Sequence, residues 1–378
     1  MKLENPFVTN GYAGADYFCD REKETEWLTT LLTNGNNVAL ISPRRIGKTD
    51  LLRHCFSQPT IQAQYHTILI DIYSTTSLAD FVEEFGKAII ATLRSKGRKV
   101  WERFLEVVSS IRSEISFDIN GQPIWGIGLG QVKTPSVTLD EIFTYLNEAD
   151  KHCLVAIDEF QQITRYHDGP NIEAMLRTYI QRCVNANFVF SGSRRHLMDA
   201  IFTSPSRPFY QQVTLMNLPK LTIEKYQPFA ASLFENHGKH LDPSVVEQLF
   251  PQFDHITAYI QRVMNMLFVL TPEGKTCTPD MTGKAVDILL DYASDTYISL
   301  FNQLTEKQRG VLLAIAMEGK AKEVTGGHFI RKHHLVSASS TRSAINILLD
   351  RDLITNENGT YQVYDPFFQL WIKQNKQP

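Results

Sequence analysis

One stretch restricts the fold more than any other: the apolar run VALIS at residues 38–42 leads through PRRIG into the helical pattern KTDLLRHCF. A buried strand, a tight loop and a helix in this order form a cradle in which backbone N–H groups and the positive end of the helix face an anion. In this cradle Gly47 allows close approach of the backbone, Lys48 supplies positive charge and Thr49 offers a hydroxyl to Mg²⁺. The stretch therefore predicts a phosphate-binding loop. Its candidate nucleotide contacts are Ser42, Pro43, Arg44, Arg45, Ile46, Gly47, Lys48, Thr49 and Asp50.

Such loops usually follow the pattern G-x-x-x-x-G-K-[ST], and Ser42 stands where the first glycine is expected. If this position needs a positive φ, a serine costs about 1–2 kcal/mol. That cost is small beside the several charge-assisted hydrogen bonds that a triphosphate receives. Pro43 also removes one backbone donor while it stiffens the loop. We therefore expect the loop to bind a nucleotide, with lower affinity than usual.

A second acidic element closes the apolar run LVAID at residues 154–158. Asp158 ends the run and Glu159 follows it, which places two carboxylates at the end of a buried strand. Because phosphoryl transfer needs positioning and charge neutralisation, we expect Thr49 and Asp158 to hold Mg²⁺ and Glu159 to deprotonate the attacking water. An acidic pair at a strand end can also be a solvated turn, and the phosphate loop upstream favours the catalytic interpretation. Glu159 and Lys48 are the candidate catalytic residues.

The segment FVFSGSRRHLM adds polar residues after another apolar run. Ser191 or Ser193 is a candidate sensor of the γ-phosphate, although a Ser/Gly turn explains the same letters. Arg194 and Arg195 either contact phosphate or begin a solvated helix.

Five short apolar, β-branched runs separated by helical patterns predict a parallel sheet buried on both faces. They are VALIS (38–42), TILID (67–71), LVAID (154–158), FVFSG (188–192) and VTLMN (213–217). Apolar residues recur at helical spacing in 22–32, where Trp27 joins three leucines, and in 139–149. The alternation predicts a layered α/β domain with right-handed crossovers. Residues 77–133 form an insertion, for which we predict a helix pair up to residue 110 and a hairpin in 115–130.

After about residue 220 the pattern becomes helical. Helices are predicted at 222–237, 243–250, 254–270 and near 284–297. The remaining pattern is helix (305–317), helix (near 328–334), helix (339–351) and a hairpin with Asn-Gly at 358–359, which is the order of a winged helix. We therefore predict an α/β core (1–220), a helical lid (221–300) and a winged-helix domain (301–378).

Composition narrows the class of protein. The net charge of −3 shows no overall nucleic-acid signature, although residues 301–378 carry ten Lys/Arg against seven Asp/Glu, a balance of +3. No apolar run has the length of a membrane helix, and MKLENPFVTN is not expected to be a signal peptide. The five cysteines are odd in number, widely spaced and without a C-x-x-C pair, which favours a reducing cytoplasm over a disulfide scaffold or zinc site.

One run imitates a different site. GIGLG at 126–130 looks like a dinucleotide-binding fingerprint, but it follows a hairpin pattern and continues into QVKTPSV. A Rossmann site needs strand, turn and helix in succession, so we reject this interpretation.

Together, these elements resemble the archaeal-type ATPases, AAA+-related members of the STAND class of P-loop NTPases found in archaea and bacteria. ISPRRIGKTDLL is similar to the family's G-P-R-R-x-G-K-T-S-L loop (Walker A), and LVAIDEFQQI to its I-D-E-F-Q element (Walker B). YFCDREKETEWL resembles F-x-G-R-E-x-E-L, with Arg21, Glu22 and Glu24 matching and Asp20 in place of glycine. FVFSGS resembles the family's fourth strand, HITAYIQRV the H-P-Y-Y-x-Q helix of its lid, and LLDRDLI…YQVYDPFFQLWI its closing winged helix.

The resemblance implies a P-loop NTPase with an AAA+-like five-stranded parallel sheet, the phosphate-loop strand central, then a helical lid and a C-terminal winged helix. ATP and Mg²⁺ would bind between sheet and lid, with Arg21 near the adenine. No arginine finger is evident, and in this class an intermolecular one can be absent. Slow ATP hydrolysis, open to stimulation by a partner, is therefore expected.

Three functional hypotheses follow. In the first, the core binds and hydrolyses Mg·ATP as a conformational switch for the winged helix, which contacts DNA or a protein. The second is a nucleotide-binding scaffold without turnover, and the third is a small-molecule kinase, which Glu159 disfavours. The helix SSTRSAINILLDRD carries as many acids as bases, so both kinds of partner stay open, as do a monomer and a ring. Its polar positions are Ser339, Ser340, Thr341, Arg342 and Asn346.

Overall fold

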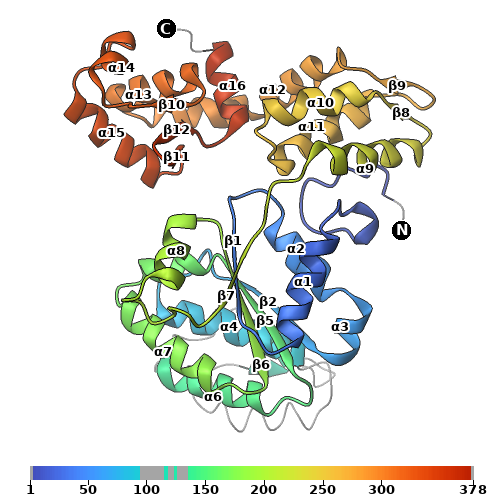
Figure 1. Ribbon diagram of the computed structural model, residues 1–378, viewed down its shortest axis with the longest axis vertical. Helices are drawn as coiled ribbons and strands as arrows, with labels where there is room; N and C mark the ends of the chain where they lie inside the picture. Colours follow the sequence, from blue (N-terminus) through green and yellow to red (C-terminus); the bar gives the residue numbers. More distant parts are fainter. Residues whose placement is uncertain (1–2, 94–114, 118–122, 126–134, 376–378) are drawn as a thin grey trace. The chain divides into compact units, whose positions relative to one another are not determined.

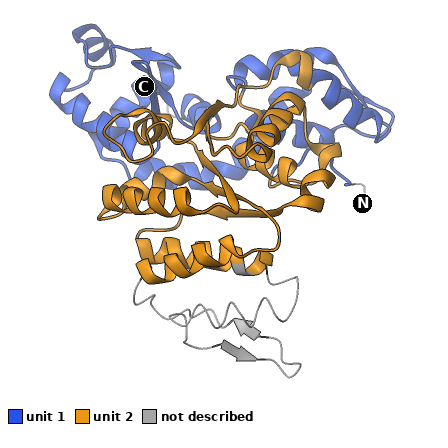
Figure 2. Ribbon diagram, turned by 60° about the horizontal axis from the view of Figure 1, so that its bottom comes forward, with its two compact units in different colours: residues 1–9, 227–255, 259–378 blue, residues 10–226, 256–258 orange. Residues whose placement is uncertain are grey.

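The computed structural model describes residues 3–93, 115–117, 123–125 and 135–375 (Figure 1). The chain forms two compact units, shown in different colours in Figure 2. Unit 2 comprises residues 10–226 and 256–258, and unit 1 comprises residues 1–9, 227–255 and 259–378. The division into three functional domains stays a prediction.

Unit 2 is built on a five-stranded parallel sheet, which confirms the predicted α/β fold. The strands are β1 (Val38–Ile41), β2 (His66–Asp71), β5 (Cys153–Asp158), β6 (Ala186–Gly192) and β7 (Thr214–Asn217). Their order across the sheet is β2-β5-β6-β1-β7. The expectation that the phosphate-loop strand is central is wrong, because β6 takes the middle and β1 lies between β6 and β7. The carboxyl end of β1 therefore lies beside that of β6.

Side chains that alternate along the strands divide the core of unit 2 into two layers. On β1, Ala39 and Ile41 belong to one apolar cluster, and Val38 and Leu40 belong to the other. The other strands and the helices on the two faces supply the rest of each cluster (Figure 1). The first face carries α4 (Leu78–Leu93), α6 (Pro135–Asn147), α7 (Gly169–Arg182) and α8 (Arg195–Thr203), and the second carries α1 (Glu22–Thr33), α2 (Lys48–Phe56) and α3 (Pro59–Gln64). Two short 3-10 helices, η1 (Ala15–Tyr17) and η4 (Phe160–Arg165), complete the unit.

Helix α1 buries less of its apolar face than its sequence predicts. Leu28, Leu31 and Leu32 are buried, whereas Trp27 is 53% exposed, so the prediction for Trp27 is wrong. The helical period places Trp27 next to Leu31 on the apolar face of α1. The face that packs against the sheet is narrower than this apolar face and leaves Trp27 outside it.

The insertion between β2 and β5 is described in part. It begins with α4, and β3 (Ile115–Phe117) pairs antiparallel with β4 (Pro123–Trp125), as the predicted hairpin requires. The second predicted helix, up to residue 110, and the GIGLG run at 126–130 lie outside the described residues.

The helical pattern after residue 220 is confirmed. The helices are α9 (Ile223–Glu235), α10 (Pro243–Gln252), α11 (Thr257–Leu270) and α12 (Met281–Asn302), with a short parallel pair of β8 (His240–Leu241) and β9 (Thr276–Cys277).

The first described residues belong to unit 1, which no sequence pattern predicted. The buried ring of Phe7 has its centroid 5.4 Å from that of Phe234 and 6.0 Å from that of Phe268. Asn265 Nδ2 donates to the Phe7 carbonyl (2.8 Å), and Asn5 Nδ2 donates to the Asn265 carbonyl (3.0 Å). Ring packing and these amide bonds anchor the amino-terminal segment on the helices of unit 1.

The end of the chain has the predicted order of a winged helix. Its elements are α13 (Glu306–Glu318), β10 (Ala321–Lys322), α14 (Gly327–Lys332), α15 (Ala338–Asp350), β11 (Ile354–Glu357), β12 (Thr360–Val363) and α16 (Pro366–Asn375). The three strands form an antiparallel sheet in the order β10-β12-β11. Asn358 (φ 51°) and Gly359 (φ 80°) turn the hairpin in left-handed conformations, as an Asn-Gly turn should.

One predicted contact residue of α15 is wrong. Ser339, Arg342 and Asn346 are exposed, whereas Thr341 is buried and its Oγ1 donates to the Ser337 carbonyl (2.8 Å). A threonine hydroxyl in a helix can donate to the backbone carbonyl of the preceding turn, so Thr341 needs no contact with a partner or with water.

Helix α13 begins with a capping box whose removal is expected to destabilise unit 1. Thr305 Oγ1 accepts the Gln308 N–H, and Gln308 Oε1 accepts the Thr305 N–H. Thr305→Ala is expected to lower the free energy of unfolding by about 1 kcal/mol, since the Gln308 N–H loses its side-chain acceptor. Urea unfolding measures this change, with Thr305→Ser as the matched control that keeps the hydroxyl. Equal stability of the alanine and serine variants would show that the cap contributes nothing.

Of the helices that the structure describes, none is both long and apolar enough to cross a membrane.

Candidate functional site

The loop that follows β1 has the backbone of an anion cradle. Gly47 precedes α2 as its N-cap with φ 90°, and Arg45 also lies in the left-handed region, with φ 65°. A Cβ on Gly47 would meet nothing within 4 Å, so glycine is required there by the backbone and not by space. The first turn of α2 thus presents its N–H groups at the end of the loop.

Ser42 follows β1 directly. It is not among the described residues with positive φ, so the expected cost of about 1–2 kcal/mol does not arise. Its side chain is buried, and its N–H points to the Gly192 carbonyl at 3.5 Å, which extends the ladder between β1 and β6. The backbone at this position therefore tolerates serine in place of glycine.

Lys48 is held by its own loop. It is 6% exposed, and Nζ donates to the carbonyls of Ser42 (3.1 Å) and Pro43 (2.9 Å). Burial lowers the pKa of Lys48 to about 8, against the opposing effect of nearby carboxylates. A phosphate in the loop would offer this ammonium a charged acceptor in place of two neutral carbonyls.

The lowered pKa of Lys48 predicts how nucleotide affinity depends on pH. A bound phosphate favours the charged ammonium, so the pKa of Lys48 rises above about 8 in the complex. Between the two pKa values binding takes up a proton, and the Kd for ATP is expected to rise by up to about tenfold per pH unit above pH 8. Calorimetric titration from pH 7 to pH 9.5 measures this slope. Lys48→Met should bind weakly without the slope, and a wild-type affinity that is constant across the range would contradict the assignment.

Thr49 and Asp158 meet across the ends of α2 and β5. Thr49 Oγ1 donates to Asp158 Oδ2 over 2.5 Å, and Asp158 Oδ1 accepts the Glu159 N–H at 3.0 Å. Mg²⁺ prefers such oxygen donors and is commonly held by one or two carboxylates together with substrate phosphates. The pair therefore fits an Mg²⁺ ion that arrives with a nucleotide. Among the described residues, no group of three or more His, Cys, Asp or Glu is placed to hold a metal ion.

Glu159 has a strained backbone and a restrained carboxylate. Its φ of 56° lies in the left-handed region, which costs a residue other than glycine about 1–3 kcal/mol. Ser193 Oγ donates to Glu159 Oε2 over 2.8 Å, and Gln161 Nε2 donates to the same oxygen. Two donors on one oxygen fix the direction of the carboxylate, which a general base needs and a solvated turn does not supply.

The two candidate sensors lie in different surroundings. Ser193 donates to Glu159 and accepts a hydrogen bond from Arg44 Nε at 3.0 Å. Ser191 is fully buried in β6 opposite Leu40, and its Oγ has no hydrogen-bond partner among the described residues. Ser193 thus meets the candidate base, and Ser191 lies inside the sheet.

The arginines also separate. Arg44 is partly exposed, with its guanidinium carbon 5.9 Å from the centroid of the Tyr73 ring, whereas Arg45 is exposed. Arg195 is 69% exposed and lies 3.6 Å from Asp199 one turn later, which favours the solvated helix start. Arg194, the residue before α8, is partly exposed.

Arg21 contacts the backbone of the phosphate loop. It is buried, Nη1 donates to Glu24 Oε1 (3.0 Å), and Nη2 lies 3.5 Å from the Ile46 carbonyl. Asp20 (φ 56°) stands in the left-handed region, where the resembling family has glycine. The contact of Arg21 with a nucleotide stays a prediction.

Four further residues complete the surroundings. Ile46 is buried in the core and anchors the loop, and burial raises the pKa of Asp50 in the first turn of α2. Sequence reasoning assigned no role to Gln161, although it is the glutamine of DEFQ, or to Asp71, which ends β2 opposite Asp158. Asp71 had a recognisable signal, because it too is an acid at the end of an apolar strand.

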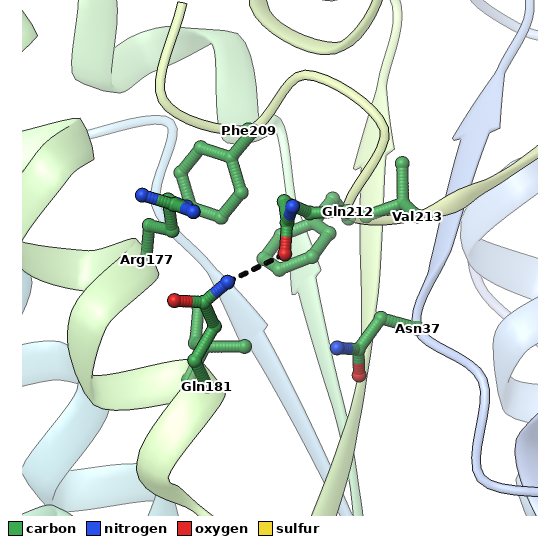
Figure 3. A pocket seen from close by; sticks show the side chains of 8 residues that line it. Asn37, Arg177, Gln181, Phe209, Gln212 and Val213 are labelled. Atoms are coloured by element: carbon green, nitrogen blue, oxygen red, sulfur yellow. Dashed lines mark hydrogen bonds between the residues drawn. The ribbon is translucent and has the colours of Figure 1, made fainter.

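A cavity of about 20 Å³ in unit 2 lies elsewhere (Figure 3). Gln181 Nε2 donates to Gln212 Oε1 across it, over 2.6 Å, beside Arg177 and Phe209. Asn37, which also lines it, precedes β1, whereas the phosphate loop follows the other end of that strand. The volume suits about one water molecule, so this cavity is not a nucleotide site.

Two family models match the chain. One, described as an ATPase domain predominantly from Archaea, matches residues 18–263, and the other, a probable winged helix domain, matches residues 295–374. No curated protein matches it.

Solved structures share the fold at low sequence identity. The Walker-type ATPase paby2304 of Pyrococcus abyssi is 15% identical with a TM-score of 0.66, and the comparison covers 97% of this chain and 99% of that one. The Aeropyrum pernix ORC2 protein is 14% identical with a TM-score of 0.60, over 98% and 96% of the two chains. The Aeropyrum pernix ORC1 protein is 13% identical with a TM-score of 0.52, over 98% and 97%. Since the first family model covers more than half of the chain, this protein belongs to the family of ATPase domains found predominantly in Archaea, and it carries a C-terminal winged helix domain.

Proposed function

We propose that this protein is an ATP-driven switch of the STAND class, which binds Mg·ATP, hydrolyses it slowly and couples the nucleotide state to its winged helix. One observation carries the proposal. The ends of β5 and β6 and the start of α2 bring Thr49 into contact with Asp158, and Ser193 into contact with Glu159. Lys48, the first residue of α2, adds a buried cation that interacts electrostatically with Asp158 and Glu159. Hydrolysis of a nucleoside triphosphate needs this combination of cation, metal ligands and a held base.

Each residue of the site has a separate role in ATP binding and hydrolysis. Lys48 and the N–H groups of the loop and α2 bind the β- and γ-phosphates, and Thr49 and Asp158 hold Mg²⁺. The metal, when bound, neutralises charge on the phosphate oxygens. Glu159 takes a proton from the water whose oxygen bonds to the γ-phosphorus. The bond from this phosphorus to the bridging oxygen breaks, and its electron pair leaves with ADP.

Product analysis tests hydrolysis against the two alternatives. Incubation with Mg·ATP is expected to yield ADP and inorganic phosphate in equal amounts. Intact ATP recovered from the complex would instead establish a scaffold, and a phosphorylated small molecule formed from a metabolite extract would establish a kinase. The similar Pyrococcus abyssi protein is described as a Walker-type ATPase, and the Aeropyrum pernix ORC2 structure holds ADPNP and ADP, which support the first outcome.

For the winged helix we propose DNA or a protein as the partner. The similar Aeropyrum pernix ORC1 protein was solved in complex with DNA, and α15 exposes Ser339, Arg342 and Asn346. Hydrogen exchange over residues 295–374 is expected to differ between the protein bound to a non-hydrolysable ATP analogue and the protein bound to ADP. Identical exchange in both states would contradict the switch. The five cysteines are free and buried, and we place the protein in the cytoplasm.

Arg342 separates the two kinds of partner. If α15 binds duplex DNA, Arg342→Ala is expected to weaken binding and to reduce the slope of log K against log salt by about 0.9, the loss of one phosphate contact. Binding titrations at four salt concentrations measure the slope. Lys284→Ala, which removes an exposed charge from α12, is the matched control. A slope that Arg342→Ala leaves unchanged would favour a protein partner.

A further inference from the structure

A directed chain of hydrogen bonds runs from the phosphate loop to Glu159. Arg44 Nε lies 3.0 Å from Ser193 Oγ, and because a guanidinium only donates, the serine oxygen is the acceptor. The hydroxyl proton of Ser193 is in turn donated to Glu159 Oε2, 2.8 Å away. The chemistry of the donors therefore fixes the order Arg44, Ser193, Glu159, with a positive charge at one end and a carboxylate at the other.

A second side chain holds Glu159 in addition to Ser193. Gln161 Nε2 donates to Glu159 Oε2 from η4, and among the described residues both side-chain bonds fall on that oxygen. Oε1 is thus the oxygen left to accept from a substrate water. Gln161 packs directly against the backbone of Gly192. A Cβ at this position would lie 2.4 Å from Gln161 Oε1 and 2.3 Å from Met198 Sδ, so only glycine leaves room for Gln161.

We propose that Arg44 is a positioning residue for hydrolysis, which orients the hydroxyl of Ser193 so that Ser193 holds Glu159 in the direction of the substrate water. The inference rests on the proposed function, since it assigns regulation of the same site. Ser193 is buried directly after β6, and Arg44 belongs to the loop for which we propose phosphate binding. A change in the conformation of this loop when phosphate binds would therefore be transmitted to Glu159 through the hydroxyl of Ser193. Arg44 contributes to turnover through Ser193 and not to nucleotide affinity.

A kinetic double-mutant cycle tests this dependence. Arg44→Ala and Ser193→Ala are each expected to lower kcat about tenfold, the value of one well-placed hydrogen bond, while the Kd for a non-hydrolysable ATP analogue changes less than about twofold. The double variant should be no slower than Ser193→Ala, because Arg44 acts through the serine. Ser193→Thr keeps the hydroxyl and should restore most of kcat. Arg195→Ala, which removes an exposed arginine after the same strand, is the control and should match the wild type.

Two kinetic outcomes would overturn the proposal. A loss of about a hundredfold in the double variant would show that Arg44 and Ser193 act independently. An affinity that falls more than about tenfold in Arg44→Ala, with kcat unchanged, would make Arg44 a ligand of the phosphates.

Urea unfolding without nucleotide separates this proposal from the proposed function. It is measured on the wild type, Arg44→Ala, Ser193→Ala and the double variant. Coupled losses of stability at Arg44 and Ser193 are expected, and additive losses would mean that the chain of bonds does not form. If the wild type binds ATP without turning it over, the proposed function fails. Non-additive losses of stability would then still show that Arg44 and Ser193 interact, but the proposed role of this interaction in hydrolysis would be overturned.

Discussion

Replacing Glu159 with glutamine is expected to lower kcat for ATP hydrolysis by about 10³-fold, which corresponds to about 4 kcal/mol of transition-state stabilisation. Glutamine has the shape of glutamate, and its carbonyl oxygen can still accept from Ser193 and Gln161, which now hold the carboxylate. What it loses is the ability to take the proton of the attacking water. The variant should therefore bind ATP within about threefold of the wild-type Kd, since the loss is confined to the transition state.

Phosphate release and equilibrium binding, measured on the same preparations, check this result. Glu148→Gln is the matched control, because Glu148 is an exposed glutamate of unit 2 beyond the end of α6. It should leave both kcat and Kd unchanged. A Glu159→Gln variant that turns over at half the wild-type rate or faster would remove Glu159 from the role of base.

Lys48→Met is expected to raise the Kd for ATP by about a hundredfold, because a hydrogen bond to a charged group contributes about 1.5–3 kcal/mol and the variant loses the one that this ammonium would make to the phosphates. Methionine keeps most of the volume of the buried side chain, so the loop should keep its packing. The carbonyls of Ser42 and Pro43 also lose their donor, which lowers the stability of the protein without nucleotide and not its affinity for ATP.

Titration with a fluorescent ATP analogue measures this loss, and thermal unfolding without nucleotide separates it from misfolding. Lys87→Met removes a charge from a half-exposed lysine that pairs with Glu83 and Glu84 on α4, and it should bind like the wild type. If Lys48→Met folds and binds ATP as tightly as the wild type, the nucleotide does not occupy this loop.

The sequence was most informative where a pattern is local. The strand VALI, the loop and the helix that begins at Lys48 are adjacent in the chain, and both the fold and the juxtaposition of Thr49 with Asp158 follow from parallel strands that share one edge. The order of the strands is not local: β1 pairs with β6 and β7, which lie far along the chain, and the family resemblance misplaced it at the centre.

Side-chain partners were the harder part. Arg44 and Ser193 are 149 positions apart, and nothing in the letters R-R or S-G-S indicates that they meet. Gln161 was visible only as a member of a motif, and its bond to Glu159 depends on the left-handed turn at that glutamate. The anchoring of Phe7 in unit 1 is a long-range packing event for which a short polar segment shows no periodicity.

Ser42 shows how a motif can mislead. The pattern has glycine at this position, which suggests a strained φ for serine, but Ser42 follows β1 without a positive φ and its N–H still points to the Gly192 carbonyl. The left-handed conformations of this loop fall on Arg45 and Gly47, so these positions, and not Ser42, determine whether the cradle forms.

The most direct test of the central claim is a time course of phosphate released from ATP by the wild-type protein, with Mg²⁺ present and with Mg²⁺ chelated. We predict that with Mg²⁺ the phosphate released exceeds the amount of protein several times over, slowly and linearly, and that chelation stops it. ATP that stays bound and intact through the same period, with or without Mg²⁺, would contradict the account and leave a protein that binds a nucleotide without hydrolysing it.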